Sequence, residues 1–213
     1  MIDKLRENCK GVRSEFSGYW KRYGGWSCLI TSPFFLAAWV LTLLCAPYWW
    51  NGNWWDLSAT VIPAVLGFSI AAFALLLSLG DDSFKLRFGQ IRVEGKQSTL
   101  TNIATSFFHF IVIQAVALAI AFVGGARIMS AVLSMAPEGS LAPWANFVFI
   151  AVAKGFRAVG FFFLAYSLMS ALAAALSIYR MALIYSTHAT KELRRRAEAE
   201  AKQAAQAAQA APP

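Results

Sequence analysis

The sequence predicts an all-α integral membrane protein, a four-helix bundle whose last helix continues as a cytoplasmic C-terminal extension. The chain is 58% hydrophobic and only 14% charged, whereas a soluble domain usually carries about 25% charged residues. Most of the charged residues lie in three blocks, at 1–25, 80–100 and 180–202. Between these blocks the chain has apolar stretches about as long as the 20 or so helical residues that cross a bilayer.

The predicted organisation has three parts: a cytoplasmic interfacial segment at 1–25, a transmembrane domain at 26–186, and a basic, alanine-rich cytoplasmic tail at 187–213. Within the transmembrane domain we expect spans at about 27–48, 58–79, 101–126 and 158–179, with a cytoplasmic loop at 80–100. Residues 145–157 are interpreted as a surface-lying or obliquely entering segment before the fourth span. Strong helix formers dominate the tail, so the fourth helix is expected to continue into water.

The N-terminal segment and the first span contain the clearest local signals for helix ends. Gly24 and Gly25 are expected to end a short surface helix, and Ser32 followed by Pro33 fits a helix start, with the serine as N-cap. The alternative is one helix from Trp26 that kinks at the proline. The segment YWWNGNWWDL follows this span. We interpret its four tryptophans as an aromatic belt at a membrane face, with an aromatic ligand site as the alternative.

The second span is the clearest of the four. The stretch Ala59 to Leu79 contains no charged residue and would form roughly 30 Å of helix, the thickness of a bilayer core. Small residues recur along one face of it at Gly67, Ala71 and Ser78. A second ridge of small residues follows in the fourth span: Ser167, Ala171 and Ala175. Small residues allow close approach of helices, so we expect these two faces to pack helix on helix.

Four polar residues lie inside or beside the apolar stretches. His109 and Gln114 fall within the third span, where interhelical hydrogen bonds are the first interpretation and a pore or proton path is the alternative. Lys154 and Arg157 are three positions apart and share a helix face. We interpret them as cations that extend to the outer headgroups, and the alternative is a pair that lines or gates a pore.

The basic residues predict the orientation. Sixteen of the nineteen lie in the N-terminal 25 residues, the 80–100 loop and the region from Arg180 onward. The positive-inside rule therefore places both termini and that loop in the cytoplasm, with the protein in the inner (plasma) membrane. Five of these cations are candidates for contact with lipid or with a partner protein: Arg87, Arg92, Arg194, Arg195 and Arg196. No aromatic residue is interleaved with the arginine run, which disfavours nucleic-acid binding.

The sequence offers little for catalysis. Its two histidines occur in no HExxH motif, no acidic residue falls clearly inside a span, and no glycine-rich phosphate loop is present. We therefore expect no enzymatic activity, no cofactor and no metal site. The three cysteines, Cys9, Cys28 and Cys45, have no CxxC spacing and are expected to be unpaired thiols.

The segment Leu66 to Phe84, LGFSIAAFALLLSLGDDSF, resembles a pattern in small multi-pass bacterial inner-membrane proteins. Some of these lie beside cytoplasmic partners in phage-defence systems, as sensor or effector subunits. The resemblance implies an oligomeric membrane sensor or effector that works with a cytoplasmic protein, and it transfers no functional residue. The alternative function is a small oligomeric ion channel or transporter.

Overall fold

The computed structural model describes residues 2–78, 92–93, 97–126 and 143–210, and the architecture is all-α. The helices are α1 (Ile2–Tyr23), α2 (Gly25–Ile30), α3 (Pro33–Leu44), α4 (Ala46–Asn51), α5 (Trp54–Ser78), α7 (Thr99–Gly125) and α9 (Pro143–Ala210). Two residues each form β1 (Arg92–Val93) and β2 (Gln97–Ser98), a short antiparallel pair in which Arg92 lies opposite Ser98.

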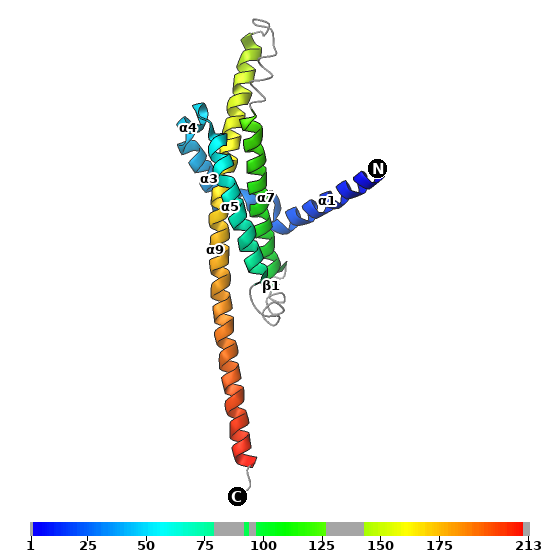
Figure 1. Ribbon diagram of the computed structural model, residues 1–213, viewed down its shortest axis with the longest axis vertical. Coiled ribbons are helices and arrows are strands. Elements are labelled where there is room, and N and C mark those ends of the chain that lie inside the picture. The colour runs from blue at the N-terminus through cyan, green and yellow to red at the C-terminus, as the bar shows by residue number, and fades with distance from the viewer. Residues whose placement is uncertain (1, 79–91, 94–96, 127–142, 211–213) are drawn as a thin grey trace.

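Among the described residues, three helices are long and apolar enough to cross a membrane: α5, α7 from Leu100, and α9 over Phe147–Ala204. They run side by side, and α3 packs against α9 (Figure 1). The membrane class predicted from the sequence is thus supported. The helix α3 has 12 residues and is about 18 Å long, which is shorter than a bilayer core.

The first predicted span, 27–48, is divided into short helices rather than forming one. Ser32 is extended, with φ −66° and ψ 127°, and Pro33 opens α3. This is the first of the two sequence alternatives, and it follows because proline disfavours a helical conformation in the residue before it. A second break follows at Cys45, where the next helix begins with Pro47 in its first turn. Upstream, α1 ends at Tyr23 and Gly24 adopts φ 103°, as the glycine pair predicts.

The helix α9 runs unbroken for 68 residues. A separate surface-lying segment at 145–157 is therefore the wrong interpretation, because this segment is collinear with the span that follows. Gly155 and Gly160 are the residues in this region that weaken a helix, and each costs only about 1 kcal/mol. The helix also continues beyond the bundle (Figure 1), and most side chains between 182 and 204 are exposed. The tail is thus helical as far as Ala210, as its strong helix formers predict.

Two of the four tryptophans belong to the core, so the aromatic-belt interpretation is wrong for them. Trp54 has no exposed surface and Trp49 is also buried. The indole nitrogen of Trp49 donates to the carbonyl oxygen of Thr42 at 2.7 Å. Trp54 packs directly against Gly160 of α9, since a Cβ there would lie 2.1 Å from the indole ring. The absence of a side chain at this glycine makes room for the tryptophan.

The small-residue face of α5 points away from the bundle. Gly67, Ala71 and Ser78 are exposed, whereas Ser69 and Ala72 are buried. The prediction that this face packs against another helix is therefore wrong within this chain. The reason is that α5 is apolar all round, so its sequence pattern does not distinguish the face that packs in the bundle from the face that does not. The α9 ridge is divided: Ser167 is buried, Ala171 is half-buried and Ala175 is exposed.

Candidate functional site

The interior of the bundle contains a histidine between two tyrosines. His109 on α7 is only 1% exposed, and its Nε2 is 2.9 Å from the hydroxyl of Tyr166 on α9. The other ring nitrogen is hydrogen-bonded to the hydroxyl of Tyr19 on α1. A neutral imidazole has one donor and one acceptor nitrogen, so one tyrosine donates to the ring and the other accepts. The ring of Tyr23 stacks on the imidazole, with centroids 3.9 Å apart.

This arrangement attaches α1 to the bundle through its last turns. Tyr19 and Tyr23 both come from the C-terminal end of α1, while the rest of the helix projects away from the bundle (Figure 1). Burial raises the pKa of both phenols above their ordinary value. Their hydroxyls therefore stay protonated at neutral pH, and the attachment is made by neutral hydrogen bonds and ring contacts rather than by charge.

A second polar contact lies deeper in the bundle. Gln114 is completely buried, and its amide nitrogen donates to Ser69 of α5 at 2.9 Å and to Ser170 of α9 at 3.4 Å. Its amide oxygen has no partner among the described residues. One side chain thereby connects all three long helices. His109 and Gln114 thus make the interhelical hydrogen bonds of the first sequence interpretation.

Lys154 and Arg157 meet at the end of α4. The ammonium of Lys154 donates to the carbonyl oxygen of Trp50 at 2.7 Å, and a guanidinium nitrogen of Arg157 donates to the same oxygen at 3.1 Å. The two cations also lie over the rings of Trp50 and Trp55, at 4.5 and 5.5 Å from the centroids. Trp50 is in the last turn of α4, where carbonyl groups lack helical partners and attract cations.

Neither sequence interpretation of Lys154 and Arg157 included this contact. The tryptophan-rich turn between the first two spans was the available signal, since indole rings attract cations. The spacing of the two cations showed that they share a helix face, but it could not show which turn of the chain that face meets.

Of the arginines predicted to contact lipid or a partner, the three on the α9 extension lie apart from this interior. Arg87 falls outside the described residues, and Arg92 is in β1. On the extension, Arg194 forms an ion pair with Glu198 at 3.1 Å, and its two neighbours Arg195 and Arg196 are exposed. The structure therefore brings none of the described arginines of the tail to the buried histidine.

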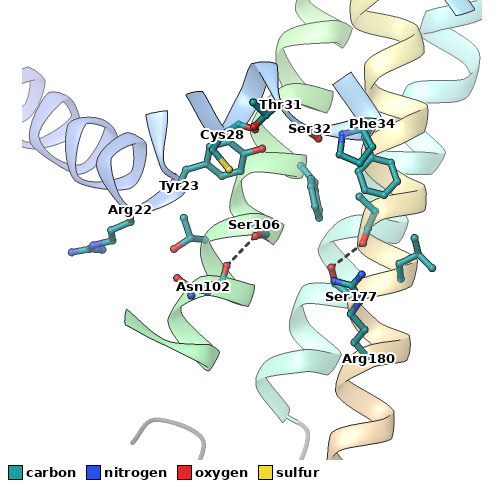
Figure 2. Close-up of a pocket in the computed structure, with 15 residues that line it drawn as sticks. Arg22, Tyr23, Cys28, Thr31, Ser32, Phe34, Asn102, Ser106, Ser177 and Arg180 are labelled. Atoms are coloured by element: carbon teal, nitrogen blue, oxygen red, sulfur yellow. Dashed lines mark hydrogen bonds between the residues drawn. The ribbon is translucent and has the colours of Figure 1, made fainter. Parts of the chain in front are cut away.

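A cavity of about 540 Å³ opens beside the tyrosine–histidine cluster (Figure 2). Tyr23 and Phe110 form part of its wall, and the cations that line it are Arg22 and Arg180. Figure 2 shows the Arg180 side chain extending upward beside Ser177, whereas Arg22 lies at the outer edge. Within the part of the chain that the structure describes, the lining includes no acidic residue. This cavity combines polar groups with positive charge, and no sequence pattern indicated it.

No group of three or more metal-ligating side chains occurs within residues 2–78, 92–93, 97–126 and 143–210. The three cysteines are free thiols. Comparison with protein-family models, curated proteins and solved structures finds no match to this chain.

Proposed function

We propose that this chain is a membrane-anchored interaction protein, a sensor or effector subunit that works with a cytoplasmic protein partner. The observation that carries the proposal is the α9 extension. From Arg180 to Ala210 it measures about 45 Å at 1.5 Å per residue, and most of its side chains are exposed. Strong helix formers allow this helix to persist in water, so it presents a long surface that the chain itself leaves uncovered and that a partner can bind.

The chemistry of the extension favours a protein or lipid surface with negative charge. It contains the arginine run 194–196 and, next to it, Leu193, whose side chain is 68% exposed. Exposed arginine next to an apolar side chain is typical of protein interfaces. The resemblance of Leu66–Phe84 to membrane subunits of phage-defence systems supports the same class of function. We propose no enzymatic role.

The finer topology belongs to this proposal. In it, α2, α3 and α4 together form a fourth, broken crossing of the inner membrane, and both termini face the cytoplasm. Broken helices are tolerated inside membranes where the protein satisfies their backbone groups, and at the first break the amides of Thr31 and Ser32 donate to backbone carbonyls of α2. Cysteine-labelling reporters at Gly52, Lys96 and Gln206 should read outside, inside and inside. An outside signal at Lys96 would overturn the orientation.

Affinity purification from detergent tests the partner. The full chain should co-purify a cytoplasmic protein, and a chain truncated after residue 190 should lose it while retaining its membrane level. The matched control is Arg194→Gln with Glu198→Gln, which removes an exposed ion pair but leaves the net charge unchanged. If the truncated chain retains the same partner, the extension is not the docking element.

The channel alternative has less support. The four polar residues that could line a pore are engaged with neighbouring helices: His109, Gln114, Lys154 and Arg157. A channel in this protein would therefore lie between subunits of a homo-oligomer. Ion leakage from liposomes that contain the purified protein tests this alternative directly, and leakage above that of empty vesicles would favour it.

A further inference from the structure

A second cavity adjoins the cationic one where α1 meets the bundle. It measures about 690 Å³ and lies between α1 and the ends of α5 and α7. Its walls are mainly apolar, and its lining residues are Val12, Glu15, Phe16, Tyr19, Arg22, Leu77, Leu100, Thr101, Ala104, Thr105 and Phe108. Arg22 and Thr105 also line the first cavity. The cationic, polar cavity and the mainly apolar one therefore adjoin each other at these two residues.

The polar cavity has unused hydrogen-bonding groups. The side chains of Ser32, Asn102 and Thr105 make no hydrogen bond with any described residue, and neither Arg22 nor Arg180 forms an ion pair within that part of the chain. Arginine binds phosphate through two parallel N–H groups, and hydroxyl and amide groups complete such sites. Because no acid among the described residues lines this cavity, the local charge there favours an anion.

The second cavity offers apolar walls, which would bind a hydrocarbon chain but would not stabilise a free anion. Val12 and Phe16 of α1 are 60% and 46% exposed, and they face Leu77 and Leu100 across the cavity. Burial of a hydrocarbon chain between these walls would remove apolar surface from water at about 25 cal/mol per Å². Both cavities lie in the size range of ligand pockets, about 300–1,000 Å³.

We propose that the chain binds one anionic phospholipid between α1 and the bundle. The phosphate lies in the polar cavity with Arg22 and Arg180, and one acyl chain lies in the apolar cavity along Ala104. Basic pockets between membrane helices are known to hold such headgroups. Only Arg180, where the docking extension begins, belongs to both; the other residues that line the two cavities lie outside the extension, and the proposal does not depend on a cytoplasmic partner.

Native mass spectrometry of the full chain, delipidated in detergent, tests the site. With equal amounts of phosphatidylglycerol and phosphatidylcholine present, one phosphatidylglycerol should remain bound per chain. The Arg22→Gln/Arg180→Gln variant should lose at least tenfold in affinity for this lipid. The matched control is Arg6→Gln/Arg13→Gln, which removes the same charge from exposed positions of α1 that line neither cavity and should bind as the unaltered chain does. Equal losses in both variants would mean general surface attraction and would overturn the proposal.

The apolar half is tested by Ala104→Phe, which fills the second cavity and should also weaken phosphatidylglycerol binding at least tenfold. Ala104→Leu is the smaller replacement if the phenylalanine variant does not elute as a folded protein. Thermal protection by inorganic phosphate alone distinguishes a free anion from a lipid. Protection by phosphate equal to that by phosphatidylglycerol, with no effect of either Ala104 variant, would overturn the lipid assignment. Unchanged lipid binding in Arg22→Gln/Arg180→Gln would do the same.

Discussion

Adding one methyl group at Gly160 should destabilise the bundle. A Cβ at this position would lie 2.1 Å from Cη2 and 2.2 Å from Cζ2 of Trp54, whereas carbon atoms in contact are about 3.5–4.0 Å apart. The indole would have to move by about 1.4 Å or more. Trp54 has no exposed surface, so its rigid ring cannot swing into open space.

The magnitude follows from two opposing effects. Overpacking a well-packed core costs about 1–3 kcal/mol, and this approach is close enough for the upper end. Alanine is about 1 kcal/mol more favourable than glycine inside a helix. Gly160→Ala should therefore lower the free energy of unfolding by about 2 kcal/mol. In a chain of this length that corresponds to a melting temperature lower by about 4–8 °C.

The matched control is Gly67→Ala on α5. Nothing lies within 4 Å of a Cβ there, so only the helix-propensity gain remains, and the variant should be more stable by up to about 1 kcal/mol. Thermal unfolding in one detergent, followed by circular dichroism, compares the two. Adding Trp54→Phe to Gly160→Ala should give less loss than the sum of the single changes, because the smaller ring removes the clash.

The reasoning fails if Gly160→Ala melts at or above the temperature of the Gly67→Ala variant. It also fails if the Trp54→Phe and Gly160→Ala effects simply add, because additivity would mean that the two residues do not touch. Either result would require a different packing of α5 against α9.

Three further predictions concern the polar contacts. Lys154→Gln/Arg157→Gln should weaken the attachment of α4 to α9 by about 1 kcal/mol, because hydrogen bonds to charged groups contribute about 1.5–3 kcal/mol and exposed ones contribute less. Proteolysis near Trp50 should become faster while ion leakage stays unchanged. Unchanged proteolysis would contradict this prediction. Tyr19→Phe should release α1 from the bundle more often, which would appear as faster hydrogen exchange in the last turns of α1. High pH should weaken the same attachment. Because burial raises the pKa of the Tyr19 phenol, its contribution to stability is complete below about pH 10 and falls as the pH rises further. Gln114→Met should change the unfolding free energy by less than about 1 kcal/mol, because polar contacts between membrane helices average about 0.6 kcal/mol; a loss above 2 kcal/mol in detergent unfolding would contradict this.

The sequence was sufficient for the elements that depend on local chemistry. The lengths of α5 and α7, the break before Pro33, the end of α1 at Gly24 and the helical extension all follow from apolar run length, proline and glycine. These signals act within a few residues, so no knowledge of the tertiary structure is needed to interpret them.

The predictions that were wrong or missing depend on which surfaces of the helices contact each other, and local sequence patterns do not specify these contacts. The small residues of α5, such as Gly67, lie on a face that is equivalent in pattern to the buried one, since the helix is apolar on all sides. The tryptophan-rich turn has the composition of an interfacial belt. The residue against which Trp54 packs, Gly160, lies more than 100 positions later in the chain, so the sequence did not indicate that contact. The cavity between Arg22 and Arg180 joins the first and last parts of the chain, and no spacing rule connects residues so far apart.

The unbroken course of α9 has a mechanical consequence. Because one helix forms part of the bundle and also the free arm, the two segments behave as one stiff rod rather than as two bodies joined by a hinge. A tilt of about 10° in the membrane would move a tip about 45 Å away by about 8 Å, with no rearrangement along the way. Bilayer thickness and lateral pressure, which set the tilt of a helix, would thus be converted into a displacement that a protein in the aqueous phase can detect.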